Sequence, residues 1–372
     1  MPHTLAFSLA QNLVRINTVN PPGNETDAVR VLAPLLKEAG FSIKEYQYGP
    51  NRSSLVAHRG RLDQPAVILS GHLDTVPFGA QPWKRPPLSG EVHDNKLYGR
   101  GSADMKGGVA VLVAAAIHFA AKVTDIPITL ILSANEEIGC GGVSRLIQEQ
   151  VLPQARCVLV AEPTGNVPCL GHKGVLWVKA TFHGTTAHAA FPHLGDNALL
   201  KAAQAVVTLN NGIVSGYSHP AMGEPTLVTS KLASGDNYNS VPDRAELGID
   251  SRSTIALPND AILSKIKTLL AHLDAEIETI FNLPPLWTDP ELDIVKSVID
   301  CCDLIRGCRH ESQIAPFYTD GGLLGPGLGG VPVIILGPGE SGMAHQVNEH
   351  VAIADLREGL DIYLEILSRL CC

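Results

Sequence analysis

No stretch of this sequence approaches the roughly 18 consecutive apolar residues that a membrane-spanning helix needs. The opening residues, MPHTLAFSLAQNLVRINTV, also lack the basic segment, apolar core and small-residue cleavage site of a secretory signal. Lys and Arg form no long run, and the net charge of −9 with a pI near 5.8 argues against a nucleic-acid or anionic-membrane surface. We therefore expect a cytoplasmic protein whose partners are small molecules, with no nucleic acid and no membrane among them.

Two further patterns are missing. The eight cysteines form no CxxC pair and show no spacing typical of a disulfide framework, so in a reducing compartment we expect free thiols. No GxSxG motif occurs, which leaves a serine-hydrolase mechanism without support.

The chain has the length and the apolar content for two domains, because it has 372 residues, 45% of them hydrophobic, and single cores rarely grow beyond about 300 residues. Continuous Val/Ile/Leu runs predict strands that are covered on both faces, at residues 66–70, 128–133, 157–161 and 331–336. Periodic apolar segments at 107–122 and 349–370 predict two of the covering helices. The expected fold class is α/β, with a mixed sheet layered by helices.

The pattern of predicted helices and strands changes between residues 173 and 283. There the order strand, helix, strand, strand, helix, strand predicts a small β-α-β-β-α-β module of ferredoxin-like type. We expect it to be inserted in the larger domain, which would then consist of residues 1–172 and 284–372.

Polar side chains that can bind a metal follow the strands of the larger domain. His72 and Asp74 follow the first apolar run, Glu136 and Glu137 the second, and Glu162 the third; a glycine-rich loop leads from the fourth to His345. Sites in open α/β sheets form outside the carboxyl ends of strands, so these residues should converge. Each of them alone could be a solvated polar residue at a strand end.

Asp104 lies in the segment YGRGSADMKGG, at the start of the helix expected near Gly107. An acidic residue there is common simply because it interacts favourably with the helix dipole. Its place beside a glycine-rich turn favours a ligand role equally. Carboxylate oxygen and imidazole nitrogen suit borderline divalent ions, and a pair of ions needs one shared carboxylate and separate further ligands. Five residues supply that set, namely His72, Asp104, Glu137, Glu162 and His345, and Glu136 remains as a base for a water molecule.

The segments that carry these residues resemble, in order, the motifs of one known family. They are SGHLDTVP, LYGRGSADMKGG, SANEEIG, AEPT and LGPGESGMAHQVNE. The family is the co-catalytic zinc family of acetylornithine deacetylase, succinyl-diaminopimelate desuccinylase, aminoacylase and glutamate carboxypeptidase. The resemblance runs over nearly the whole chain. It implies a zinc-peptidase-like catalytic domain and makes the inserted module a lid or dimerisation domain.

The resemblance also implies a role for each residue of the metal site. Asp104 would bridge two metal ions, His72 and Glu162 would complete one site, and Glu137 and His345 the other. Asp74 would orient the imidazole of His72, and Glu136 would act as the general base. The ions would be two divalent metals, Zn²⁺ first, although Co²⁺ and Mn²⁺ fit the same ligands.

Three residues of the inserted module complete the implied site. His188 would reach the reaction centre of the partner subunit of a homodimer, and Asn239 and Arg252 would bind a carboxylate of the substrate. Two simpler interpretations remain open: Arg252 could pair with a neighbouring acidic residue, and His188 could be one of several surface histidines.

The function that the resemblance implies is hydrolysis of the amide bond of an N-acyl amino acid by metal-activated water. Cleavage of a dipeptide or of a C-terminal amino acid, as in other members of the family, is the alternative. A distant alternative is a nucleotide-dependent enzyme, because GPGESG at 337–342 formally matches the GxGxxG motif of dinucleotide-binding proteins. In dinucleotide-binding proteins a second strand with an acidic residue follows the motif after about 20 residues. No such strand follows here, and Pro338 occupies the tight turn.

Overall fold

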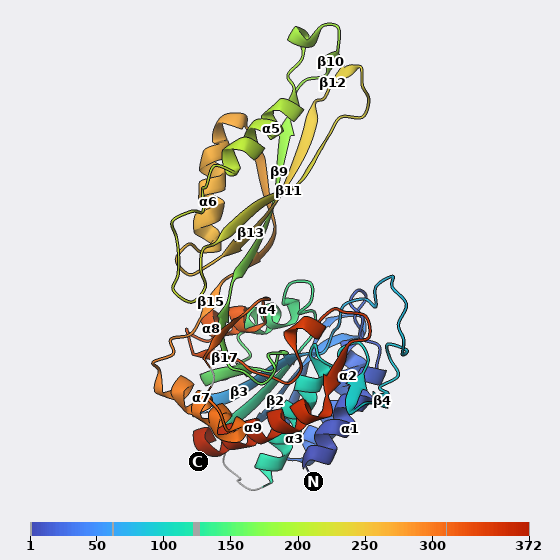
Figure 1. Cartoon of the computed structure of the whole chain (residues 1–372), viewed down its shortest axis with the longest axis vertical. Coiled ribbons are helices and arrows are strands. Elements are labelled where there is room, and N and C mark those ends of the chain that lie inside the picture. Colours follow the sequence, from blue (N-terminus) through green and yellow to red (C-terminus); the bar gives the residue numbers. More distant parts are fainter. Residues whose placement is uncertain (1, 62, 122–126, 310, 372) are drawn as a thin grey trace. The chain divides into compact units, whose positions relative to one another are not determined.

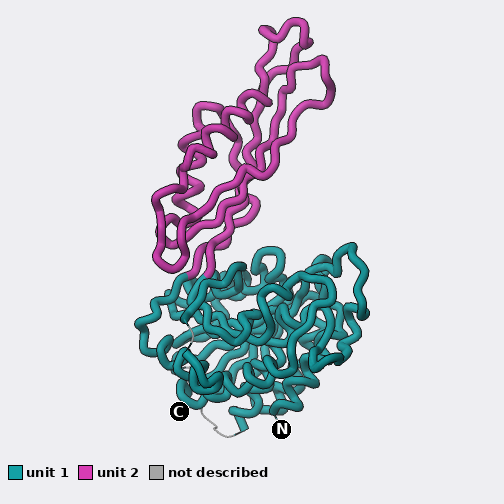
Figure 2. Tube along the Cα trace, in the orientation of Figure 1, with its two compact units in different colours: residues 1–171, 287–372 teal, residues 172–286 magenta. Residues whose placement is uncertain are grey.

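The computed structural model describes residues 2–61, 63–121, 127–309 and 311–371. The chain forms two compact units, residues 1–171 with 287–372 and residues 172–286 (Figure 2). We call them the first and the second unit. Within the described residues, no helix is both long enough and apolar enough to cross a membrane. The cysteines described there, which include all but Cys372, are free thiols, as expected.

The first unit is built on a mixed sheet. Along the sheet, the order of its main path is β1 (Ser42–Gly49), β2 (Arg52–Arg59), β6 (Ile128–Ser133), β3 (Ala66–His72), β7 (Ala155–Val160), β17 (Val333–Ile335), β8 (Cys169–His172) and β15 (Leu286–Trp287), with β16 (Gln313–Ala315) paired to β8. The central strands β6, β3, β7 and β17 run parallel. The strands on either side of them, β2 and β8, run antiparallel to their neighbours. This confirms the mixed sheet.

Helices cover the sheet (Figure 1). One group packs together and comprises α1 (Pro2–Arg15), α3 (Lys106–Ala120), α7 (Asp293–Arg306) and α9 (Ile353–Cys371), while α2 (Glu25–Glu38) packs on β2 and β1. The short helices α4 (Gly141–Gln148) and α8 (Gly321–Gly327) contact each other, and α8 also contacts β7 and β17. The sequence of α3 is almost wholly apolar, so this helix is buried nearly all round.

Gly108 explains how α3 comes so close to the sheet. A Cβ atom at this position would lie 2.0 Å from the carbonyl oxygen of Ala161, so only glycine allows the contact. The contact brings the start of α3 to the end of β7, directly before Glu162. The same packing therefore places the loop that carries Asp104 beside the carboxyl ends of the central strands.

The end of the chain differs from the expectation. The helix expected over 349–370 begins only at Ile353, because residues 350–352 form strand β18 (His350–Ala352), which pairs with β5 (Lys96–Tyr98). Strand β5 also pairs with β4 (Val92–His93), so a small three-stranded sheet forms among the described residues. The helix expected over 107–122 is observed as α3, and its last expected residue lies outside the described residues.

The second unit contains an antiparallel sheet in the order β11 (Thr226–Ser234), β13 (Arg244–Ser253), β9 (Gly174–His183) and β14 (Glu276–Leu283). Helices α5 (Ala198–Leu209) and α6 (Asn259–Leu270) cover one face of it. Alternate residues of β13 are buried against these helices, as a strand with one covered face requires. The chain order of these elements is β-α-β-β-α-β. A short ribbon of β10 (Ala187–His188) and β12 (Ser240–Val241) extends from this sheet.

Candidate metal centre

Residues at the carboxyl ends of the parallel strands meet in the first unit. His72 is the last residue of β3, Glu136 and Glu137 lie just after β6, and Glu162 follows β7. Asp104 comes from the loop before α3, and His345 from the loop after β17. These elements are far apart in the sequence, but parallel neighbours end at one edge of the sheet.

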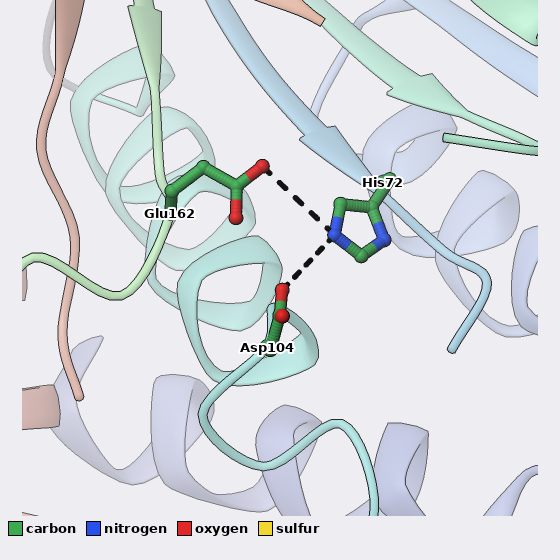
Figure 3. A group of neighbouring side chains, drawn as sticks. All are labelled: His72, Asp104 and Glu162. Carbon is green, nitrogen blue, oxygen red and sulfur yellow. Dashed lines mark hydrogen bonds and ion pairs between the residues drawn. The ribbon is translucent and has the colours of Figure 1, made fainter. Parts of the chain in front are cut away.

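Two groups of three side chains offer ligand atoms within 4.8 Å of one another. In the first group, Nε2 of His72 lies 3.2 Å from Oδ1 of Asp104 and 3.9 Å from Oε1 of Glu162 (Figure 3). In the second group, Nε2 of His345 lies 3.4 Å from Oδ2 of Asp104 and 3.1 Å from Oε2 of Glu137. Asp104 thus presents one oxygen to each group. We refer to them as the His72 group and the His345 group.

The charges in this region fit a cation. Burial raises the pKa of Glu136 and of Glu162 well above the usual range, and neighbouring carboxylates add to the rise while His72 opposes it. Hydrogen bonds to Asp104 and Glu137 raise the pKa of His345 to about 10. Carboxylates that are costly to ionise, together with an imidazole that is easily protonated, mark a place where positive charge is stabilised.

One carboxylate oxygen of the His345 group has no hydrogen-bond partner and could therefore bind a metal ion. Oε1 of Glu137 is buried and has no hydrogen-bond partner, although its Oε2 contacts His345. A buried carboxylate oxygen without a partner is costly, and a metal ion would compensate for that cost. Nitrogen and oxygen donors of this kind suit Zn²⁺, Co²⁺ and Mn²⁺. The residues present therefore fit a pair of divalent ions that share Asp104.

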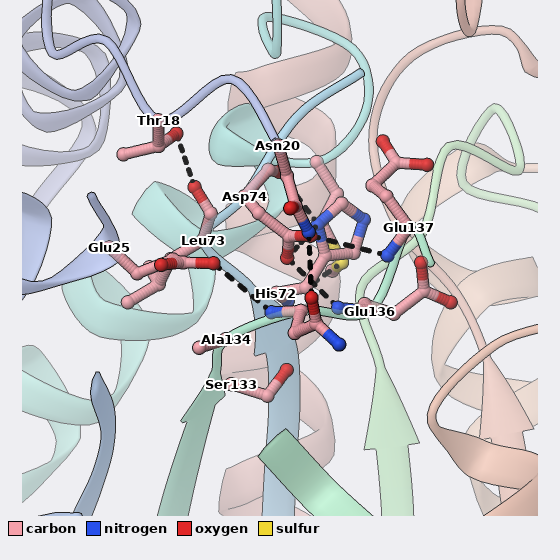
Figure 4. Close-up of polar contacts among 12 residues, drawn as sticks. Thr18, Asn20, Glu25, His72, Leu73, Asp74, Ser133, Ala134, Glu136 and Glu137 are labelled. Carbon is pink, nitrogen blue, oxygen red and sulfur yellow. Dashed lines mark hydrogen bonds and ion pairs between the residues drawn. The ribbon is translucent and has the colours of Figure 1, made fainter. Parts of the chain in front are cut away.

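Asp74 acts on its surroundings differently from the expectation. Nδ1 of His72 bonds to the backbone oxygen of Asp74 at 2.9 Å, whereas the nearest carboxylate oxygen of Asp74 lies 3.7 Å away. The carboxylate instead accepts the backbone N–H groups of Glu136, at 3.0 Å, and Glu137, at 3.3 Å (Figure 4). Asp74 thus orients His72 through its main chain and holds the turn at residues 136–137 through its side chain.

Glu136 is buried beside the two groups but belongs to neither of them. The turn that carries it is fixed from several directions, because the preceding residue, Asn135, donates its backbone N–H to Glu25 and its side-chain amide to Tyr48. Asn20 bonds both to Asn135 and to the carboxylate of Asp74 (Figure 4). The sequence singles out neither Asn20 nor Glu25, because their contacts with Asp74 and Asn135 span 54 to 115 positions of the chain.

The carboxylate of Asp320, at the start of α8, is a further buried acid near Glu136. It accepts a hydrogen bond from Ser133 at 2.5 Å, and it lies within hydrogen-bonding reach of the Cys140 thiol, which is itself 3.8 Å from Oε1 of Glu136. Ser133 and Cys140 stand at the two ends of the turn that carries the glutamates. Asp320 therefore ties both ends of that turn to α8.

The residues expected in the inserted module lie in two separate places within the second unit. His188 and Asn239 come together in the ribbon, where the N–H of Ala189 donates to the backbone oxygen of Asn239 at 2.9 Å. Arg252 lies near the opposite end of β13 and forms two hydrogen bonds with Asp250, at 2.9 and 3.1 Å. The simpler interpretation of Arg252, pairing with a neighbouring acid, describes its contacts in this structure.

The GPGESG segment does not form a phosphate-binding turn. Its last two residues belong to the short 3-10 turn Ser341–Met343, which does not lead into an α-helix, and the carbonyl groups of Gly337 and Gly339 accept N–H bonds from residues 164–166. A dinucleotide site needs the N-terminus of a helix after the glycine turn. The distant alternative of a nucleotide-dependent enzyme is therefore wrong for this segment.

Comparisons with known proteins point to one family. The model of peptidase family M20/M25/M40 matches residues 68–369. The acetylornithine deacetylase of Vibrio atlanticus is 27% identical over 94% of this chain and 92% of the relative. The probable succinyl-diaminopimelate desuccinylase of Staphylococcus aureus is 28% identical over 96% of each chain.

Solved structures share the fold over nearly the whole length. The M20 family metallo-carboxypeptidase Sso-CP2 of Sulfolobus solfataricus superposes with a TM-score of 0.80 at 19% identity, covering 97% of this chain and 98% of that one. A Bacillus subtilis protein described as a dinuclear metal-binding peptidase of the M20 family gives a TM-score of 0.74 at 14% identity, covering 100% of this chain and 98% of that one. At these identities the likeness shows the fold.

Proposed function

Because this chain belongs to peptidase family M20/M25/M40, we propose that it hydrolyses the amide bond of an N-acyl amino acid at the centre formed by the His72 and His345 groups. The observation that carries this proposal is the pair of ligand groups joined by Asp104, with the buried Glu136 beside them. The curated relatives named as a deacetylase and a desuccinylase favour an acyl amino acid. Cleavage of a dipeptide is the second candidate, since the solved relatives include peptidases.

The residues of the two groups would hold two divalent ions, of which Zn²⁺ is our first choice and Co²⁺ or Mn²⁺ alternatives. When bound, such ions supply Lewis-acid activation of the amide carbonyl and of a water molecule. Glu136 takes one proton from water as the water oxygen bonds to the carbonyl carbon, and it then passes that proton to the nitrogen, which leaves as the C–N bond breaks. The products are a carboxylate and an amine.

A panel assay tests this function. Amine release would be measured with N-acetyl and N-succinyl amino acids and with dipeptides, using the Glu136→Gln variant as a control for contaminating hydrolases. Turnover of acyl amino acids by the wild-type protein alone supports the proposal. Turnover restricted to dipeptides selects the second candidate, and turnover of neither class refutes both.

Asp74→Asn should lower metal affinity or activity by about 10- to 100-fold, the usual cost of losing a partner that orients the ligands. An asparagine at this position keeps one acceptor oxygen but turns an amide group toward the N–H donors of residues 136 and 137. Asp63→Asn is the matched control. Asp63 is exposed and forms an ion pair with Arg61, so its replacement should change neither the metal affinity nor the activity. If Asp74→Asn kept the wild-type metal affinity and the wild-type activity, the carboxylate of Asp74 would not be needed to orient the ligands.

The second unit supports the proposal that the enzyme works as a homodimer. Leu199, Leu200 and Val207 of α5 are exposed, and α5 packs beside the edge strand β11, where Val228 and Leu232 are also exposed. The opposite edge strand, β14, carries Glu276 and Glu278, and charged residues at an edge discourage pairing with another chain. Strand β11 carries a single charged residue, Lys231, so the apolar helix face lies next to the less charged of the two edges, and this arrangement suits a two-fold contact.

The separation of His188 from Arg252 supports catalysis across that dimer. Arg252 lies eight positions after the first residue of β13, Arg244, a span of roughly 27 Å, and the ribbon that carries His188 lies beyond that first residue. A small acyl amino acid cannot touch both residues of one chain. We therefore infer, as the family resemblance implies, that His188 acts in the centre of the partner subunit, where the imidazole would stabilise the developing oxyanion.

Mixing two inactive variants tests this arrangement. When Glu136→Ala and His188→Ala chains with different tags exchange subunits, each mixed dimer holds one centre with both groups intact. Activity should reappear at about half of the wild-type value per mixed dimer, by that count of centres. Isolated mixed dimers that stay inactive would show that His188 serves its own chain or has only a structural role.

A further inference from the structure

Arg100 and Glu349 form a buried ion pair next to the candidate metal centre. Arg100 is 2% exposed and Glu349 is fully buried, and Nη1 of the arginine lies 2.7 Å from Oε2 of the glutamate. Burying two charges is expensive unless both are well hydrogen-bonded. The contacts of this pair are therefore informative about what it does.

The Glu349 carboxylate organises the loop that carries Asp104. It accepts three backbone N–H groups of that loop, from Gly101 at 3.1 Å, Ala103 at 2.9 Å and Asp104 at 3.0 Å. Successive N–H groups that turn toward one anion form a concave anion-binding site, and here the anion is a side chain of the same protein. The shape of this loop, and with it the position of the Asp104 carboxylate, depends on Glu349.

Arg100 contacts the other loop. Its guanidinium donates to the carbonyl oxygens of Gln346 at 3.3 Å and His345 at 3.4 Å, and to that of Pro77 at 3.0 Å. It also lies over the ring of Trp83, with 5.2 Å between Cζ and the ring centroid. Arg100 thus holds the backbone of His345, the ligand candidate whose side chain is 54% exposed.

The pairing of β5 with β18 places Gly99, the neighbour of Arg100, opposite Glu349. Tyr98 pairs with His350, and the N–H of Gly99 donates to the backbone oxygen of Glu349 at 2.9 Å. Arg100 follows β5 and Glu349 precedes β18. The small sheet therefore fixes the Asp104 loop against the His345 loop, and the ion pair connects them beside the ligands.

We propose that Arg100 and Glu349 are positioning residues that set the geometry of the two ligand groups, Glu349 through Asp104 and Arg100 through His345. This inference rests on the proposed function, because it requires that the groups bind metal ions. It assigns different effects to the two residues. Loss of Glu349 should disturb both groups, since Asp104 belongs to both, whereas loss of Arg100 should disturb mainly the His345 group.

Binding of Zn²⁺ measures these effects without any assay of activity. The metal-stripped full-length chain would be titrated with Zn²⁺ by calorimetry, and the bound metal counted after dialysis. The variants are Arg100→Gln, Arg100→Lys and Glu349→Gln. Arg100→Lys retains a positive charge for Glu349 but cannot span several carbonyl groups, so it remains informative if a neutral replacement fails to fold.

Arg59→Gln is the matched control. Like Arg100, Arg59 donates to backbone carbonyl groups, those of Ala39 and Ala120, and its Nε is buried without a partner. Ala120 is the last residue of α3, whereas Asp104 lies just before the first, so the control removes a similar side chain at the far end of that helix.

The expected result is a difference between variants. Both Arg100 variants should keep one ion at wild-type affinity and bind the other about 10- to 100-fold more weakly, and Glu349→Gln should weaken both ions by a similar factor. Arg59→Gln should bind two ions as the wild type does.

Folded Arg100 and Glu349 variants with wild-type affinity for both ions would overturn the inference. The inference would also be overturned if the metal affinity of every variant, Arg59→Gln included, fell in proportion to its melting temperature. The ion pair would then have only a structural role. If the wild-type chain itself binds no Zn²⁺, the proposed function fails and the inference falls with it.

Discussion

Replacing Glu136 with glutamine should lower kcat by about 10²- to 10⁴-fold while the protein keeps its metal ions, because the change removes a proton acceptor and no ligand. Glutamine has nearly the same shape, and the bond from the backbone N–H of residue 136 to Asp74 does not involve its side chain. The turn should therefore stay in place. Initial rates together with the metal content of the purified variant measure the two quantities.

Glu149→Gln provides the matched control for this experiment. Glu149 lies at the other end of α4, pairs with Arg145 on the surface and contacts neither ligand group, so its replacement should leave kcat unchanged. A Glu136→Gln protein that retains its turnover would assign the proton transfer to another group. The buried carboxylate of Asp320 would then be the first residue to replace.

Removing the metal ions should reduce hydrolysis to background, and adding Zn²⁺ or Co²⁺ should restore it with close to two ions per chain. Without a cation, Asp104, Glu137 and Glu162 lie close together as acids beside the imidazoles of His72 and His345. The substrate carbonyl would also lose the charge that polarises it. Treatment with a chelator, dialysis and stepwise addition of metal, each followed by an assay and a metal count, give the measurement.

Addition of Mg²⁺ alone is the control for this restoration, because Mg²⁺ prefers six oxygen ligands and should restore little. Full activity in protein shown by elemental analysis to be stripped of metal would refute the two-metal proposal. Restoration with a single ion per chain would confine the chemistry to one of the two groups.

The parts of the centre that could be predicted from the sequence are those that a local pattern marks. His72, Glu137 and Glu162 each follow a continuous apolar run, and the rule for parallel strands brings such ends together. The β-α-β-β-α-β order of the second unit follows in the same way from the spacing of apolar residues. The structure shows these elements where the pattern indicates them.

Other features could not be predicted because a single long-range contact defines them. The apolar pattern predicts a helix that begins at Glu349, yet this residue precedes strand β18 and its carboxylate bonds to backbone groups about 245 positions earlier. The actual partners of Asp74 are backbone N–H groups, which every residue possesses, so no residue type signals them. Likewise, the spacing of Asp250 and Arg252 gives no preference between pairing with each other and binding a substrate.

The order in which the chain is synthesised gives the contact between Glu349 and the Asp104 loop a further consequence. Asn20, near the beginning, and His345 with Glu349, near the end, all belong to the same small region, and α9 at the C-terminus packs on α3 next to it. A growing chain on the ribosome can form the central strands and still lack both the His345 group and the anchor of Asp104. Hydrolytic activity can therefore begin only after residues 345–349 have been synthesised, and a chain cut short before residue 345 is released without a complete His345 group.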